Sequence, residues 1–200
     1  MIEVVCEQLS PEWFAHRRGI PTSSQFSRIM TSTGGRSKQW DDYAREVAGE
    51  RLATFQVPAW AGNADTKRGI RMEPRARTWY EFDREVRVRQ VGLLLHDCRR
   101  FGASTDGLID ADQGVLEIKC PNPKEHGQTL LTGKVPAGHL AQVHGALVVT
   151  GWQWVDFVSY CPGLKEVVIR VTPNDLTERL RLLLELFCDD VDRLVPILAA

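Results

Sequence analysis

The sequence predicts an α/β protein in which a central β-sheet is flanked by helices. Apolar and polar residues alternate at residues 86–91 and 115–119, which is typical of strands. Apolar residues recur at helical spacing within residues 40–53 and 172–194. With 200 residues, of which 43% are hydrophobic and 26% charged, the chain has enough apolar material for one core. We therefore expect a single domain that spans residues 1–200.

Net charge excludes a wholly basic, histone-like binder, because the formal value is -1. The charge is nevertheless segregated along the chain. Residues 67–100 carry ten Lys or Arg and five Asp or Glu, whereas residues 173–200 carry three and six. A basic face and an acidic face are expected, and phosphate contacts require only the basic one.

The five cysteines are odd in number and contain no Cys-x-x-Cys pair. We expect reduced thiols in a cytosolic compartment and no zinc site. The chain shows no basic leader followed by an apolar stretch, and no run of eighteen apolar residues. These patterns predict neither secretion nor membrane insertion.

The first predicted element is a helix at residues 12–18, with Ser10 as its cap and Pro11 at its first position. Gly19 ends it. Residues 21–24 offer a second cap before a helix at residues 25–30. A capped helix start with free N–H groups, placed after two arginines, predicts an anion site. The alternative is an ordinary helix-turn-helix corner with solvent-exposed arginines.

Residues 31–38 and 57–63 are predicted loops, on either side of an amphipathic helix at residues 40–53. Trp60 in the second loop is expected to pack on the protein itself or on a neighbouring subunit, and base stacking is the alternative. Residues 67–83 predict another helix, with Pro74 near its first turns. Its arginines form a cationic track able to follow a phosphate backbone.

Residues 86–91, 93–96, 101–104, 107–109 and 115–119 are predicted to form the central sheet. The polar segment 110–114 reads as a tight connection between two strands, which brings Asp106 next to Glu117. Strand alternation places Glu117 and Lys119 on the same face.

Downstream, we expect a short helix within residues 121–131, a helix at residues 137–149, and strands at residues 153–160 and 166–171. A long helix at residues 172–194 is expected to pack against the sheet or against another subunit. His126, His139 and His144 are interpreted as packing residues, because a histidine on a helix is more often a packing residue than a metal ligand.

Two carboxylates and one ammonium at a sheet edge predict a metal-dependent reaction. Magnesium borrows one or two carboxylates together with substrate phosphate oxygens. A lysine beside such a cation is expected to have a lowered pKa and to bind or deprotonate the attacking water. The combination suits phosphodiester hydrolysis.

These residues carry a family resemblance. Asp106, ten intervening residues and then Glu117-Ile118-Lys119 resemble the signature of the PD-(D/E)xK nuclease superfamily. Residues 116–121, Leu-Glu-Ile-Lys-Cys-Pro, resemble the lambda exonuclease and YqaJ-type viral recombinase family. Three further segments resemble motifs of that family, over residues 13–24, 69–80 and 139–144. The resemblance runs from about residue 13 to about residue 170.

Two departures from the family pattern concern the turn at Asp106 and the segment 139–144. The chain has Thr105 where the family has proline in Ser-Pro-Asp-Gly, and His144 where the family has its second glutamine. The first change removes a residue that would fix the turn, but it leaves the Asp106 carboxylate in place. The histidine is shorter and titratable, so the glutamine's role does not transfer to it.

The resemblance implies a central mixed sheet in a restriction-endonuclease-like core, and it also implies site residues. Metal ligation of Mg²⁺, or of Mn²⁺, is implied for Asp106, Glu117, the backbone carbonyl of Ile118, and Glu73. Lys119 and Gln142 would position the attacking water, and together with Asp106, Glu117 and Glu73 they make up the implied catalytic set. Arg17 and Ser24 would hold a terminal 5′ phosphate.

The implied function is a 5′ to 3′ exonuclease that degrades one strand of linear double-stranded DNA. It would leave 3′ single-stranded tails for phage-type recombination. The resemblance further implies a homotrimer at DNA ends, a single-strand annealing recombinase as partner, and a phage or prophage protein in the cytoplasm of a bacterial host. Two alternatives stay open: a PD-(D/E)xK endonuclease, and a non-catalytic DNA-binding or assembly module.

Overall fold

The computed structural model describes residues 1–54 and 64–200, so Trp60 lies outside the described residues. The helical elements are α1 (Pro11–Arg17), the 3₁₀ helix η1 (Ser23–Arg28), α2 (Trp40–Leu52), α3 (Ala64–Arg84), η2 (Asp110–Asp112), α4 (Pro123–Thr132), α5 (Ala137–Thr150) and α6 (Asp175–Ala199). The strands are β1 (Ile2–Val4), β2 (Leu93–Leu95), β3 (Gly102–Ala103), β4 (Gly107–Ile109), β5 (Gly114–Lys119), β6 (Trp154–Ser159) and β7 (Val167–Val171).

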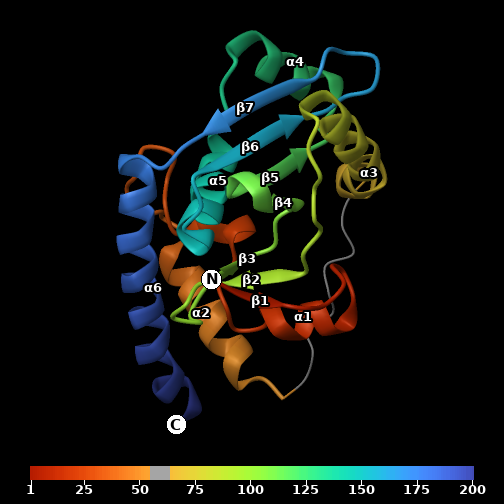
Figure 1. The fold of residues 1–200 in the computed structure, drawn as a ribbon. Helices are drawn as coiled ribbons and strands as arrows, with labels where there is room; N and C mark the ends of the chain where they lie inside the picture. Colours follow the sequence, from red (N-terminus) through yellow and green to blue (C-terminus); the bar gives the residue numbers. More distant parts are fainter. Residues whose placement is uncertain (55–63) are drawn as a thin grey trace.

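The α/β class with flanking helices is confirmed, but the strands form two sheets in place of one (Figure 1). β1, β2 and β3 make a small antiparallel sheet. The larger sheet has the order β4-β5-β6-β7 and is mixed, because β5 and β6 run parallel while the outer pairs are antiparallel.

The predicted strand at residues 86–91 is wrong. Only Arg89 forms a bridge there, with Leu108. The backbone N–H of Val88 donates to the Glu81 carboxylate at 2.9 Å, and the side chain of Arg89 pairs with Glu3 and Asp110. The alternating sequence is therefore held by side chains of neighbouring elements, without a regular ladder.

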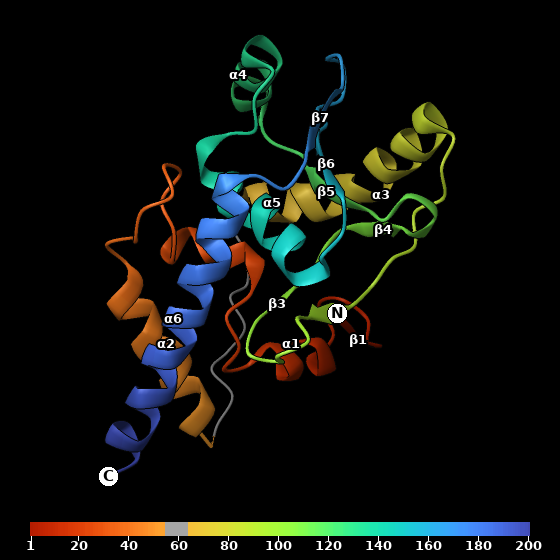
Figure 2. The same ribbon diagram turned by 60° about the vertical axis from the view of Figure 1, so that its left-hand side comes forward.

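The larger sheet is covered on both faces (Figure 2). Val115 of β5 belongs to the main core with Val143 and Leu147 of α5. Leu116 and Ile118 belong to a second cluster on the other face, which includes Ala76 and Tyr80 of α3. The predicted alternation along β5 is thus confirmed, and the strand is enclosed between α3 and α5.

Helix α6 packs mainly against α2 and α5, so its expected packing on the sheet is wrong (Figures 1 and 2). Phe187 meets the rings of Trp40 and Tyr43 from α2, with ring centroids 5.2 and 5.1 Å away. Acidic residues of α6 form ion pairs with Arg51 and Arg100 at 2.6 Å. Part of the acidic face predicted from the sequence therefore forms ion pairs within the protein.

Among the described residues, no helix is long and apolar enough to cross a membrane.

Candidate active site

The β4–β5 hairpin aligns the two carboxylates that the sequence singled out. Gly107 lies opposite Leu116, so the antiparallel register extended by one residue sets Asp106 opposite Glu117. The backbone N–H of Asp106 donates to the Leu116 carbonyl at 3.1 Å, and Oδ2 of Asp106 accepts from the Ile118 N–H. The aspartate is therefore fixed to β5 through both backbone and side chain.

Glu117 lies at the centre of this cluster and is buried, with 1% of its surface exposed. Its Oε1 accepts from Lys119 Nζ and from Gln142 Nε2, each at 2.6 Å. Its Oε2 is buried without a hydrogen-bond partner among the described residues. Burying a carboxylate oxygen without a partner costs free energy. A cation or a hydrogen-bond donor bound at Oε2 would remove this cost.

Glu73 enters the cluster from α3. Its carboxylate pairs with Arg77 one turn later, and Arg77 Nε also donates to the backbone carbonyl of Asp106 at 3.2 Å. Arg77 is largely buried. The Glu73–Arg77 pair is therefore not a solvated surface pair, because it joins α3 to Asp106, the residue just before β4.

Burial and mutual repulsion change the titration of the carboxylates. Desolvation raises the pKa of Glu117 to about 7; Lys119 opposes the rise and Asp106 adds to it. Desolvation likewise raises the pKa of Glu73 to about 7, with Asp106 adding to it and Arg77 opposing it. The pKa of Asp106 is raised mainly by burial. Three crowded carboxyls thus favour protonation unless additional positive charge is bound.

For Lys119 the structure corrects the expected direction. Burial lowers the pKa of its ammonium, but the three carboxylates outweigh burial and raise the pKa above its ordinary value. The ammonium is therefore the charged partner of Glu117. A lowered pKa would require a bound cation to offset these carboxylates.

The donor set fits a hard divalent cation better than a zinc ion. Within residues 1–54 and 64–200, no three His, Cys, Asp or Glu side chains are gathered as a complete metal cage. Magnesium does not require one, since it keeps several waters and takes one or two carboxylates. Asp106, the unpaired Oε2 of Glu117 and the Ile118 carbonyl on the same strand supply oxygen donors of this kind.

The three histidines have other surroundings. His126 is buried and bonds Ser159 Oγ at 2.8 Å and the Lys165 carbonyl at 2.9 Å. His144 bonds Thr177 Oγ1 at 2.8 Å, which joins α5 to α6. Burial, and then Lys119, lower the pKa of His139 to about 4. The packing interpretation is confirmed for His126 and His144.

Arg17 organises a second polar cluster, between α1 and η1. Its guanidinium donates to Ser104 Oγ at 3.0 Å, to Thr22 Oγ1 at 2.9 Å and to Ser24 Oγ at 3.2 Å, and it stacks over Trp13. The predicted helix at residues 25–30 is a 3₁₀ helix without a side-chain cap, and the Thr22 hydroxyl accepts from Arg17. Burial lowers the pKa of Arg17 to about 10, which leaves it charged at neutral pH.

Ser104 connects the two clusters, because it bonds Arg17 and lies two residues before Asp106. Sequence reasoning missed Ser104 and Arg77 as site residues. The signals were present: Ser104 precedes the aspartate by one strand period, and Arg77 follows Glu73 at a helical spacing of four. Thr105, which replaces the family proline, has its carbonyl held by Gln8 at 2.8 Å.

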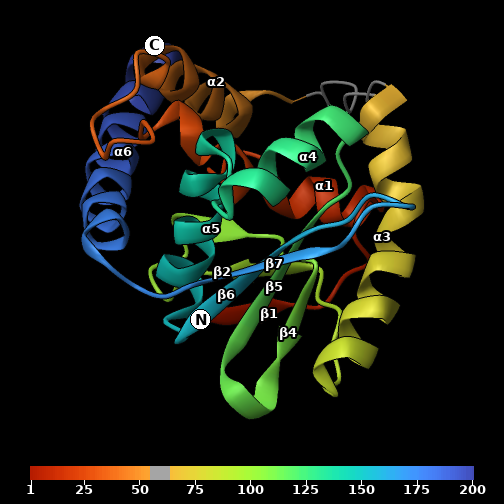
Figure 3. The same cartoon turned by 90° about the horizontal axis from the view of Figure 1, so that it is seen from above.

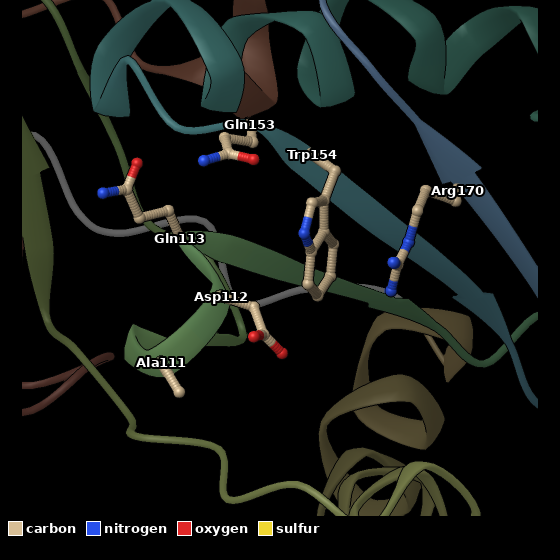
Figure 4. Close-up of a pocket in the computed structure, with 6 residues that line it drawn as sticks. All are labelled: Ala111, Asp112, Gln113, Gln153, Trp154 and Arg170. Atoms are coloured by element: carbon tan, nitrogen blue, oxygen red, sulfur yellow. The ribbon is translucent and has the colours of Figure 1, made fainter.

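A pocket elsewhere on the sheet contains none of the predicted site residues (Figure 4). It is lined by Ala111, Asp112, Gln113, Gln153, Trp154 and Arg170, beside the start of β5, whereas Glu117 and Lys119 lie towards its end. Arg170 stacks on Trp154 and pairs with the buried Asp156. The contacts of Arg170 with Trp154 and Asp156 therefore explain why these side chains lie together at the pocket.

The fold and these two clusters define a member of the YqaJ-like viral recombinase family. The model of the YqaJ-like viral recombinase domain matches residues 12–153, and the chain belongs to this family. No curated protein sequence matched this chain.

Solved structures of exonucleases have the same fold as this chain. An alkaline exonuclease from Laribacter hongkongensis, LHK-Exo, is 33% identical, with a TM-score of 0.84 over 95% of this chain and 96% of the other. LHK-Exo in complex with dAMP is 32% identical, with a TM-score of 0.83 over 94% and 96%. A phage-related exonuclease from Haemophilus somnus, 12% identical, shares the fold with a TM-score of 0.71 over 92% and 99%.

Proposed function

We propose that this protein is a metal-dependent 5′ to 3′ exonuclease that digests one strand of linear double-stranded DNA and leaves 3′ single-stranded tails. One observation carries the proposal: the unpartnered Oε2 of Glu117, buried beside Asp106 and Lys119. The pKa values of three neighbouring carboxyls are raised although Lys119 and Arg77 lie beside them. A bound Mg²⁺ or Mn²⁺ would supply the additional positive charge that such carboxyls favour. Family membership and the two LHK-Exo structures support the reaction class.

The residues of the site would have three roles: holding the cation, holding the attacking water and positioning the other groups. Asp106, Glu117, the Ile118 carbonyl and Glu73 would hold the cation, which when bound supplies a Lewis acid that stabilises charge on phosphate oxygens. Lys119 and Gln142, both bonded to the same oxygen of Glu117, would hold the attacking water. Arg77 would keep Glu73 and the Asp106 backbone in place.

End dependence is proposed from the Arg17 cluster. A charged guanidinium with the Ser24, Thr22 and Ser104 hydroxyls around it is a ready site for a terminal 5′ phosphate. Ser104 sets this site two residues from Asp106, so a strand held there by its 5′ end would present its first phosphodiesters to the carboxylates. A PD-(D/E)xK endonuclease would not require such a terminus.

Partners and assembly are proposed from the family alone. A viral recombinase of this kind would work as a homotrimer at DNA ends, together with a single-strand annealing recombinase, in the cytoplasm of a bacterial host.

Digestion of linear and circular duplexes of the same sequence tests the proposal. Linear duplex with Mg²⁺ is expected to release mononucleotides, whereas a covalently closed circle with Mg²⁺, or linear duplex with EDTA, is expected to stay intact. Cutting of the circle would favour the endonuclease. No digestion of either DNA across Mg²⁺ and Mn²⁺ concentrations would favour the non-catalytic module.

A further inference from the structure

The outer face of α3 carries an exposed stripe made of Arg71, Arg75, Thr78 and Phe82, hereafter the α3 stripe. These positions follow one another at spacings of four, three and four residues, so they lie on one side of the helix. The opposite side carries Glu73, Arg77 and Tyr80 and faces the protein. Figure 3 shows α3 along one side of the molecule, away from α6.

Within residues 1–54 and 64–200, the two arginines of the α3 stripe have no partner. Both are exposed, and neither forms a hydrogen bond or ion pair with any residue that the structure describes. Arginines elsewhere on the surface, such as Arg45 and Arg181, pair with Asp or Glu. The α3 stripe therefore presents uncompensated positive charge.

Phe82 is the anomaly of the α3 stripe, because 86% of this large aromatic residue is exposed. The carboxylates next to it are engaged elsewhere: Glu81 accepts from the Val88 N–H and Asp83 pairs with Arg84. An exposed aromatic ring that follows two arginines with no partner in the described part of the chain is typical of surfaces that stack on nucleobases and contact phosphates.

The exposed ring of Phe82 favours single-stranded over double-stranded nucleic acid. Base faces inside a duplex are covered by their neighbours, so Phe82 can stack only on an unpaired base. The stripe extends over about 16 Å at the helical rise, which corresponds to roughly five stacked nucleotides. It also begins near the reaction site, since Arg68, one turn before Arg71, donates to the carbonyl of Cys120, the neighbour of Lys119.

We propose that the α3 stripe binds the strand of DNA that the enzyme leaves undigested, with Arg71 and Arg75 contacting its phosphates and Phe82 stacking on an unpaired base. The identity of the strand rests on the proposed exonuclease function. Binding of single-stranded DNA by this face does not depend on cleavage, so it is measurable by itself.

The test is fluorescence anisotropy with a labelled single-stranded 20-mer, in an Asp106→Asn background with EDTA to prevent digestion. Phe82→Ala is expected to weaken the Kd about tenfold or more, given the stacking contribution of one base. The double variant Arg71→Ser/Arg75→Ser is expected to reduce the slope of log K against log salt by about 1.4, since two phosphate contacts are lost.

Matched controls are Leu131→Ala, which removes another apolar side chain that is 85% exposed, and Arg45→Ser/Arg181→Ser, which removes two paired surface arginines. Both are expected to bind like the Asp106→Asn parent. Equal affinity and salt slope for all variants, or no binding by that parent, would overturn the proposal.

Two further readouts separate the remaining outcomes. If Phe82→Ala changes the sedimentation coefficient while single-strand affinity is unchanged, the α3 stripe joins copies of this chain and the proposal is wrong. Mononucleotide release from linear duplex, measured with the α3 variants carrying a native Asp106, reports the proposed exonuclease function separately. Loss of that activity in every protein, with intact single-strand binding, would contradict the nuclease and leave the α3 surface supported.

Discussion

Lys119→Ala is expected to lower the rate of mononucleotide release by two to four orders of magnitude, the range typical of a lost general acid or base. The Lys119 ammonium donates to Oε1 of Glu117 at 2.6 Å, while Oε2 of the same carboxylate has no hydrogen-bond partner among the described residues. Without it, neither the position of the attacking water nor the charge of Glu117 is maintained. Single-turnover digestion of a linear 5′-phosphorylated duplex with Mg²⁺ measures the effect.

Two companion variants make this result specific. Lys134→Ala removes an exposed lysine after α4 and is expected to retain parental activity. Lys119→Arg keeps a positive charge but supplies a group that cannot be deprotonated, so it is expected to fold and remain inactive. Parental activity in a folded Lys119→Ala protein would contradict the assignment of this lysine.

Arg17→Ala is expected to remove the preference for 5′-phosphorylated ends, lowering kcat/KM for such ends roughly 10- to 100-fold. This range corresponds to one charge-assisted contact of about 1.5–3 kcal/mol. Ends with a 5′ hydroxyl are expected to be digested by the variant at nearly the parental rate. Competition between 5′-phosphate and 5′-hydroxyl duplexes in one reaction measures the ratio directly.

The choice of control for Arg17 follows from the structure. Arg18, the next residue, donates to the Glu50 carbonyl and takes no part in the Arg17 cluster, so Arg18→Ala is expected to keep the preference. Arg17→Lys retains charge without the planar fork that reaches three hydroxyls, and it is expected to recover only part of the selectivity. A parental enzyme that prefers 5′-hydroxyl ends would contradict the phosphate site.

The core of the site was predictable because it is local. Asp106, Glu117 and Lys119 lie within one hairpin, whose register follows from strand alternation and a short polar connection. Glu73, Gln142 and Arg17 come from separate elements. Their approach depends on tertiary packing, so the sequence indicated Glu73 and Gln142 only through the family resemblance. Arg17 was indicated by that resemblance and by its place ahead of a predicted anion site.

The predictions were wrong where side chains from distant elements determine the backbone conformation or the packing of a segment. Residues 86–91 alternate like a strand, yet the Glu81 carboxylate accepts from the backbone N–H of Val88, which a ladder would use, and the Arg89 side chain pairs with Glu3. α6 shows the same limit: its apolar spacing predicted a helix correctly, but the choice of α2 over the sheet depends on aromatic rings that no local pattern reveals. Arg77 was missed because an arginine beside a glutamate on a helix is usually a surface pair.

Calorimetric titration of Mn²⁺ tests the central claim, that Asp106 and Glu117 share one divalent cation. Burial raises the pKa of Glu117 to about 7, so a proton on Glu117 competes with the metal at pH 6 and is largely lost at pH 8; burial raises the pKa of Asp106 as well. The parent protein is expected to bind Mn²⁺ more tightly at pH 8 and to release protons when it binds at pH 6, whereas Glu117→Gln is expected to lose the binding. A Glu117→Gln protein that titrates like the parent at both pH values would contradict the shared site.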